Sequence, residues 1–172
     1  HTLNAVIEMA HGLGLRVFLM PFVYVLDESP GSWRGAIQPA DEDLWWRSYG
    51  NYIEHYARLA ATTKVSLFSV GSELKTRATH AHRWGELIGR VKATFPGRVT
   101  YSANWDNYQR FSTWDLMDVV AINAYFPLTQ SYRPSVPALV DAWMPHKAAL
   151  VDWSASHARP YIFSEAGYRS SM

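Results

Sequence analysis

Hydrophobic residues return along this chain with two different spacings. In four segments they recur every three or four residues, which predicts amphipathic helices at 3–13, 41–59, 79–95 and 136–156. Between these segments lie short apolar runs rich in valine, isoleucine and phenylalanine, which are typical of buried strands. The predicted strands cover residues 15–23, 65–74, 98–105, 117–125 and 161–165.

The order of these elements favours a parallel sheet, because strands and helices alternate except at a shortened third connection. Such a sheet is either open and doubly wound or part of a closed eight-stranded barrel. Polar residues at the C-terminal ends of the strands favour the barrel, since barrel enzymes assemble their sites there, and the phosphate-binding glycine loop typical of the open sheet is absent. These polar residues are Glu73, Asn104, Trp105, Asn123, Tyr125 and Glu165.

We therefore expect an α/β fold, a partial (β/α)8 TIM barrel that covers roughly strands 3 to 7. A complete barrel typically needs about 250 residues, whereas this chain has 172. The expectation is a single barrel fragment over residues 1–172, without the first two strands and the last one.

Composition narrows the range of partners. The net charge is +1 with acids and bases interspersed, so no basic stripe for nucleic acid is present, and no apolar run approaches the ~20 residues of a membrane span. Cysteine is absent, which excludes disulfides and thiolate metal sites but leaves the compartment open, secreted or cytoplasmic. Aromatic residues make up 15% of the chain, with eight tryptophans, which suits a cleft where flat rings stack on sugars.

Two of the predicted strands end at a glutamate. Glu73 follows the run that begins at Val65, and Glu165 follows the run that begins at Tyr161. Two carboxyl groups supply what glycosidic bond cleavage requires, a proton for the departing oxygen and either a nucleophile or an activated water. A separation of ~5–5.5 Å would favour double displacement, and ~6.5–9.5 Å would favour inversion.

The segments around these glutamates resemble a known family. Val-Gly-Ser-Glu-Leu at 70–74, Ala-Ile-Asn-Ala-Tyr-Phe-Pro at 121–127, Phe-Ser-Glu-Ala-Gly-Tyr-Arg-Ser at 163–170 and the loop Ser-Trp-Arg-Gly-Ala-Ile at 32–37 are similar to the retaining β-mannanases of glycoside hydrolase family 113. These are barrel glycosidases that carry the acid and the nucleophile on strands four and seven, and the resemblance spans essentially the whole chain.

The resemblance implies a role for several residues. Glu73 matches the acid/base, Glu165 the nucleophile, and Tyr125 the tyrosine that donates to the nucleophile. Asn123 lies two residues before Tyr125 and hence on the same strand face. Contacts to the sugar are expected by position from Trp33, Asn104, Trp105 and Asn123.

Two positions depart from the wider pattern of these glycosidases. Ser72 stands directly before the acid/base where most relatives carry asparagine, and Phe22 stands at a strand end where a polar group is expected. The pair His80 and His82 has a spacing that does not suit a metal site on a helix, so it is interpreted as a solvated helix start.

The resemblance implies a retaining hydrolase that cleaves β-1,4-mannan or related β-mannosides and needs no cofactor. The expected partner is a polysaccharide or oligosaccharide substrate, with no nucleic acid and no membrane. Two alternatives stay open: another β-glycosidase of the same clan, acting on glucan or galactan, and a catalytically inactive, carbohydrate-binding barrel fragment.

Overall fold

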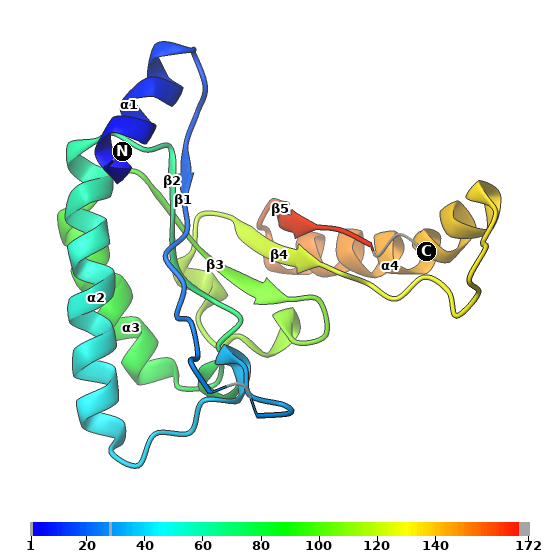
Figure 1. The fold of residues 1–172 in the computed structure, drawn as a ribbon, viewed down its shortest axis with the longest axis horizontal. Coiled ribbons are helices and arrows are strands. Elements are labelled where there is room, and N and C mark those ends of the chain that lie inside the picture. Colours follow the sequence, from blue (N-terminus) through cyan, green and yellow to red (C-terminus); the bar gives the residue numbers. More distant parts are fainter. Residues whose placement is uncertain (1, 28, 169–172) are drawn as a thin grey trace.

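Five parallel strands form the centre of the structure, a computed structural model that describes residues 2–27 and 29–168. They pair in the order β1-β2-β3-β4-β5, the same as their order in the chain. Figure 1 shows a curled sheet flanked by helices. The fold is α/β, a partial TIM barrel, as predicted from the alternating pattern. The strands are β1 (Phe18–Leu19), β2 (Leu67–Ser72), β3 (Arg98–Asn104), β4 (Val120–Ala124) and β5 (Tyr161–Ala166).

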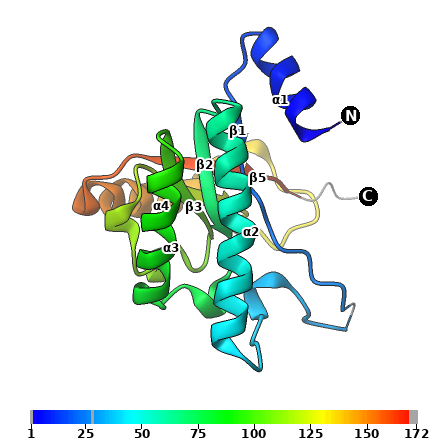
Figure 2. The same ribbon diagram turned by 90° about the vertical axis from the view of Figure 1, so that its left-hand side faces the viewer.

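Four α-helices accompany the sheet in the described part of the chain: α1 (Leu3–Gly12), α2 (Glu42–Thr62), α3 (Ala81–Thr94) and α4 (Val136–His157). Helices α2 and α3 run side by side along β1 to β3, and α4 lies along β4 and β5 (Figures 1 and 2). Helix α2 begins where the Asp41 carboxylate accepts a hydrogen bond from the Leu44 amide at 2.9 Å. Such a cap satisfies one of the free amides at a helix start.

The core lies between the sheet and the α2–α3 pair. Strands β2 and β3 contribute Phe68 and Tyr101, and the helices contribute Ile53, Trp84 and Leu87, all at most 1% exposed. Strands that are covered on both faces need apolar side chains on both, which explains why β2 reads as a nearly continuous apolar run. This packing holds the C-terminal end of β2 in a fixed position.

Two predicted segments differ most from the structure. The strand predicted at 15–23 is wrong in length, because only Phe18 and Leu19 pair with β2. Pro21 has no N–H to continue the ladder. The loop predicted at 27–40 contains a short 3-10 helix, η1 (Arg34–Ala36).

The third connection is short, as predicted. It contains two 3-10 turns, η3 (Tyr108–Arg110) and η4 (Trp114–Leu116), instead of a helix. In the described ranges, no helix combines the length and the apolar character needed to cross a bilayer.

Candidate active site

Glu73 directly follows β2 and has a left-handed backbone conformation, with φ of 55°. This conformation costs a non-glycine residue about 1–3 kcal/mol. Two hydrogen bonds offset the cost: the Glu73 amide donates to the Ser102 carbonyl at 2.9 Å, and the Leu74 amide donates to the Tyr101 hydroxyl at 2.7 Å. The turn aims the Glu73 side chain into the site, where it is 12% exposed.

A register shift precedes Glu73. Ser69 pairs with Thr100 and Ser72 pairs with Ser102, so β2 uses one residue more than β3 over this stretch. An extra residue of this kind changes which face the following side chains point to.

A second register shift places Glu165. Ile122 pairs with Phe163, whereas the next residue, Asn123, pairs with Glu165, so Ser164 is the extra residue of β5. The Ser164 hydroxyl donates to the Asn123 amide oxygen at 2.8 Å. Because side chains alternate between the faces of a strand, the shift puts Glu165 beside Asn123. Both glutamates therefore follow an irregularity in the sheet.

Asn123 joins the two glutamates. Its side chain is fully buried in β4, and its Nδ2 lies 2.9 Å from Glu73 Oε1 and 3.2 Å from Glu165 Oε1. The same nitrogen is 3.4 Å from the Ser72 hydroxyl. Because both carboxylate oxygens contact one nitrogen, their separation cannot exceed the sum of 2.9 and 3.2 Å, about 6.1 Å. The structure thus brings together Glu73, Glu165 and Asn123.

Tyr125 completes this group. Its hydroxyl donates to Glu165 Oε2 at 2.9 Å. The hydrogen bond to Glu165 is the main cause that raises the pKa of Tyr125, with further contributions from burial and from the charges of Glu165 and Glu73. A raised pKa keeps the hydroxyl protonated, so that it remains a donor to the Glu165 carboxylate.

Arg34 is a member of the site that sequence analysis missed. Its Nη2 lies 3.1 Å from Glu73 Oε2, and its guanidinium carbon lies 4.8 Å from the centre of the Phe22 ring. Phe22, where a polar group was expected, is therefore a platform for a cation. A lone arginine in a loop is ordinarily interpreted as solvated, so only its place in the motif at 32–37 could have drawn attention to it.

The three remaining predicted sugar contacts lie outside this group. Asn104 binds its own loop, with its amide nitrogen 3.1 Å from an Asp106 oxygen and its amide oxygen 3.1 Å from the Trp105 nitrogen. The Trp105 ring packs on Phe126, with 5.8 Å between centroids, in a cavity of about 290 Å³. Trp33, 36% exposed, lines a separate cavity of about 320 Å³. The structure brings none of these three into hydrogen-bonding contact with the glutamates in the described ranges.

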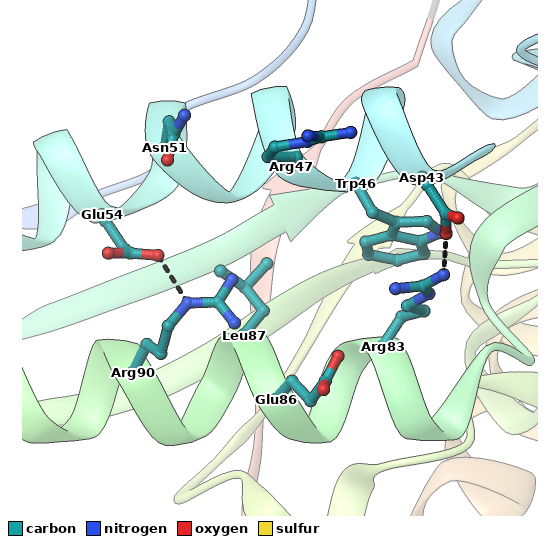
Figure 3. A pocket seen from close by; sticks show the side chains of 9 residues that line it. All are labelled: Asp43, Trp46, Arg47, Asn51, Glu54, Arg83, Glu86, Leu87 and Arg90. Carbon is teal, nitrogen blue, oxygen red and sulfur yellow. Dashed lines mark hydrogen bonds and ion pairs between the residues drawn. The ribbon is translucent and has the colours of Figure 1, made fainter. Parts of the chain in front are cut away.

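Another pocket, of about 660 Å³, lies between α2 and α3 (Figure 3). Two ion pairs cross it between the helices: Arg83 binds Asp43, and Arg90 binds Glu54. None of its lining residues belongs to the group formed by Glu73, Glu165, Asn123 and Tyr125, so we interpret it as a solvent-exposed groove between the two helices.

Metal ligands are not grouped in the ranges that the structure describes: no cluster of three or more histidine, aspartate or glutamate side chains is arranged to hold an ion. His82 is exposed and lies 3.6 Å from Glu86. His80 precedes α3, with its Nδ1 3.2 Å from the Arg77 carbonyl oxygen.

Comparison with solved structures identifies several similar proteins. A family 113 β-mannanase from Alicyclobacillus acidocaldarius, solved in complex with ManMIm, is 31% identical, with a TM-score of 0.80 over 94% of this chain and 49% of that one. A family 113 β-1,4-mannanase is 28% identical, with a TM-score of 0.80 over 96% of this chain and 51% of that one. The chain thus spans about half the length of these relatives.

More distant structures share only the fold. Fungal β-1,4-galactanases are 16% identical, with a TM-score of 0.59 over 92% of this chain and 54% of theirs. Among proteins with curated descriptions, none matches the sequence. The model of Glycoside Hydrolase Family 113 matches residues 1–172 in full, and the chain therefore belongs to glycoside hydrolase family 113.

Proposed function

We propose that the protein is a retaining glycoside hydrolase that cleaves β-1,4-mannan or related β-mannosides. The observation that carries the mechanism is the shared contact of Asn123 Nδ2 with one oxygen of each glutamate, which keeps these oxygens within about 6.1 Å. A close pair of carboxyl groups fits double displacement, where the groups are ~5–5.5 Å apart, better than inversion, which needs ~6.5–9.5 Å. The similarity to family 113 β-mannanases supports the choice of substrate.

In the first half of the reaction, Glu165 attacks the anomeric carbon while Glu73 gives its proton to the glycosidic oxygen. The bond between carbon and leaving oxygen breaks, and an ester between sugar and Glu165 forms. Tyr125 supports this assignment, because its hydroxyl donates to Glu165 Oε2 and thereby orients the carboxylate for attack.

In the second half, Glu73, now ionised, takes a proton from water. The resulting hydroxide attacks the anomeric carbon, and Glu165 is released as a carboxylate. Asn123 donates to an oxygen of both glutamates, so it stabilises whichever of them carries negative charge. The carboxyl groups supply both the proton and the nucleophile, so the proposed chemistry needs no cofactor.

Replacing each glutamate by alanine in the full-length protein tests the proposal. Glu73→Ala and Glu165→Ala should each abolish release of reducing ends from mannan, and Glu86→Ala, an exposed glutamate beside the pocket of Figure 3, should leave it unchanged. Activity retained by either of the first two variants would contradict the assignment.

Azide separates the two roles, because it can attack the glycosyl-enzyme without a general base and can also take the place of a missing nucleophile. With Glu73→Ala and a dinitrophenyl β-mannobioside, whose leaving group departs without a proton, azide should trap the glycosyl-enzyme and give a glycosyl azide of retained configuration. With Glu165→Ala it should attack directly and give the inverted azide. The opposite pattern would exchange the roles of the two residues.

A panel of mannan, glucan and galactan tests the substrate. Galactanases share this fold, so the fold alone does not identify the polysaccharide. If galactan or glucan is cleaved faster than mannan, that polysaccharide replaces mannan as the proposed substrate. Sugar binding without cleavage of any of the three would support an inactive carbohydrate-binding barrel.

A further inference from the structure

The carboxylate of Glu73 has a partner on each of its oxygens. Asn123 donates to Oε1, and Arg34 pairs with Oε2 at 3.1 Å. A residue that passes a proton to the glycosidic oxygen must contact that oxygen directly, within about 2.6–3.2 Å. The partner on the oxygen that exchanges the proton therefore competes with the glycosidic oxygen for contact with it.

Asn123 is held in place more firmly than Arg34. It lies in the middle of the sheet, is fully buried, and accepts a hydrogen bond from Ser164 in the neighbouring strand. Arg34 belongs to a connecting loop, and its side chain is 22% exposed. Its buried Nε has no hydrogen-bond partner within the part of the chain that the structure describes. Of the two partners, Arg34 is the one that can move.

We infer that Oε2 is the oxygen of Glu73 that exchanges the proton, and that Arg34 is a positioning residue for Glu73 that the arriving sugar displaces. The inference rests on the proposed role of Glu73 as acid/base. In the first half of the reaction the proton passes from Oε2 to the leaving oxygen, which departs with the aglycone. Glu73 is then an anion, and Arg34 pairs with it until water has replaced the aglycone.

The loop around Arg34 is built to keep the guanidinium within reach of Glu73. The Thr76 hydroxyl donates to the Ile37 carbonyl at 2.6 Å and so ties the loop to the segment that follows Glu73. The Arg34 guanidinium also lies over the face of the Phe22 ring. A cation over an aromatic face is stabilised by the ring without using any of its N–H donors. Arg34 can therefore leave Oε2 without losing all of its contacts.

The experiment compares two substrates in the full-length protein. Mannotriose has a sugar leaving group that needs a proton to depart, whereas dinitrophenyl β-mannobioside has a leaving group that departs without one. The quantity measured is kcat/KM, which reports the first irreversible step. Arg34→Ala should lower kcat/KM for mannotriose at least about tenfold, within the range that general acid catalysis supplies, and change it less than about twofold for the dinitrophenyl substrate.

Two further variants keep the experiment interpretable. Arg34→Lys keeps the charge but not the planar group that stacks on Phe22, so its loss should be intermediate and show the same dependence on the leaving group. Arg83→Ala removes an arginine from an exposed ion pair with Asp43 on the helix surface of Figure 3, and should change neither substrate.

An equal loss on both substrates would show a structural role for Arg34 and overturn the inference, as would an unchanged or increased kcat/KM for mannotriose. Glu73→Ala, measured with the same two substrates, separates this outcome from a failure of the proposed function. If Glu73→Ala loses only the mannotriose activity and Arg34→Ala does not, Glu73 is still the acid and Arg34 does not position it. If Glu73→Ala itself shows no dependence on the leaving group, the role of Glu73 fails, and the inference with it.

Discussion

Gly71 lies in β2, two residues before Glu73, where three aromatic side chains meet the backbone. A Cβ atom added there would lie 2.6 Å from the Tyr49 hydroxyl and 3.2 Å from the rings of Trp84 and Tyr101. All three side chains are buried. In the described chain the glycines with positive φ are Gly14 and Gly31, so Gly71 is required for space and not for its dihedral angles.

Gly71→Ala should therefore destabilise the protein. Inserting a methyl group into a well-packed core costs about 1–3 kcal/mol. The Tyr49 hydroxyl, which donates to the Val70 carbonyl at 2.8 Å, has to move, and loss of that buried hydrogen bond adds about 1 kcal/mol. The expected decrease in the free energy of unfolding is about 2–4 kcal/mol, measured from urea denaturation of the full-length protein.

Gly89→Ala is the matched control. Gly89 lies on the exposed side of α3, and an added Cβ there meets nothing within 4 Å. Alanine in a helix is more favourable than glycine by about 1 kcal/mol, so this variant should be slightly more stable. Both changes replace glycine by alanine and affect the unfolded chain alike. Equal shifts in the same direction would refute the packing argument at Gly71.

Two more predictions concern hydrogen bonds of the site and its loop. Tyr125→Phe removes the donor to Glu165 Oε2 and should lower kcat/KM on mannan about 10–100-fold, the equivalent of about 1.5–3 kcal/mol for a bond to a charged group; unchanged kinetics would exclude the orienting role. Hydrogen bonds from Ser29 and Ser32 lower the pKa of Asp27 to about 2. They stabilise the loop above the ordinary pKa of 3.8 and are lost as the pH falls toward 2, so proteolysis of the loop should increase over that range, and Asp27→Asn should abolish the dependence.

Much of the architecture can be predicted from local sequence patterns. Each strand that sequence analysis predicted exists, because an apolar run of strand length can be recognised without knowing its neighbours. The placement of Glu73 and Glu165 at strand ends followed from the same pattern, as did the short third connection. The strand that differs most in length from its prediction, at 15–23, is one of the two edge strands of the described sheet, where pairing with β2 limits the strand more than its own composition does.

The contacts of the site depended on the tertiary structure. Whether Glu165 faces Asn123 or points away from it is decided by the register shift at Ser164, and the shift before Ser72 acts in the same way on the other side. Register is a relation between two strands, and a change of one residue reverses the face to which a side chain points. No single segment carries that information.

The alternation of helices and strands, the parallel sheet and the two acidic strand ends were thus determined by the sequence through the periodicity of its apolar residues. The tertiary structure alone decided that one buried amide contacts both glutamates, that Arg34 pairs with Glu73, and that Phe22 supports Arg34. The physical reason is distance along the chain: the residues of each contacting pair are between 12 and 50 positions apart, since Phe22 precedes Arg34 by 12 and Asn123 follows Glu73 by 50. Only folding brings them into contact.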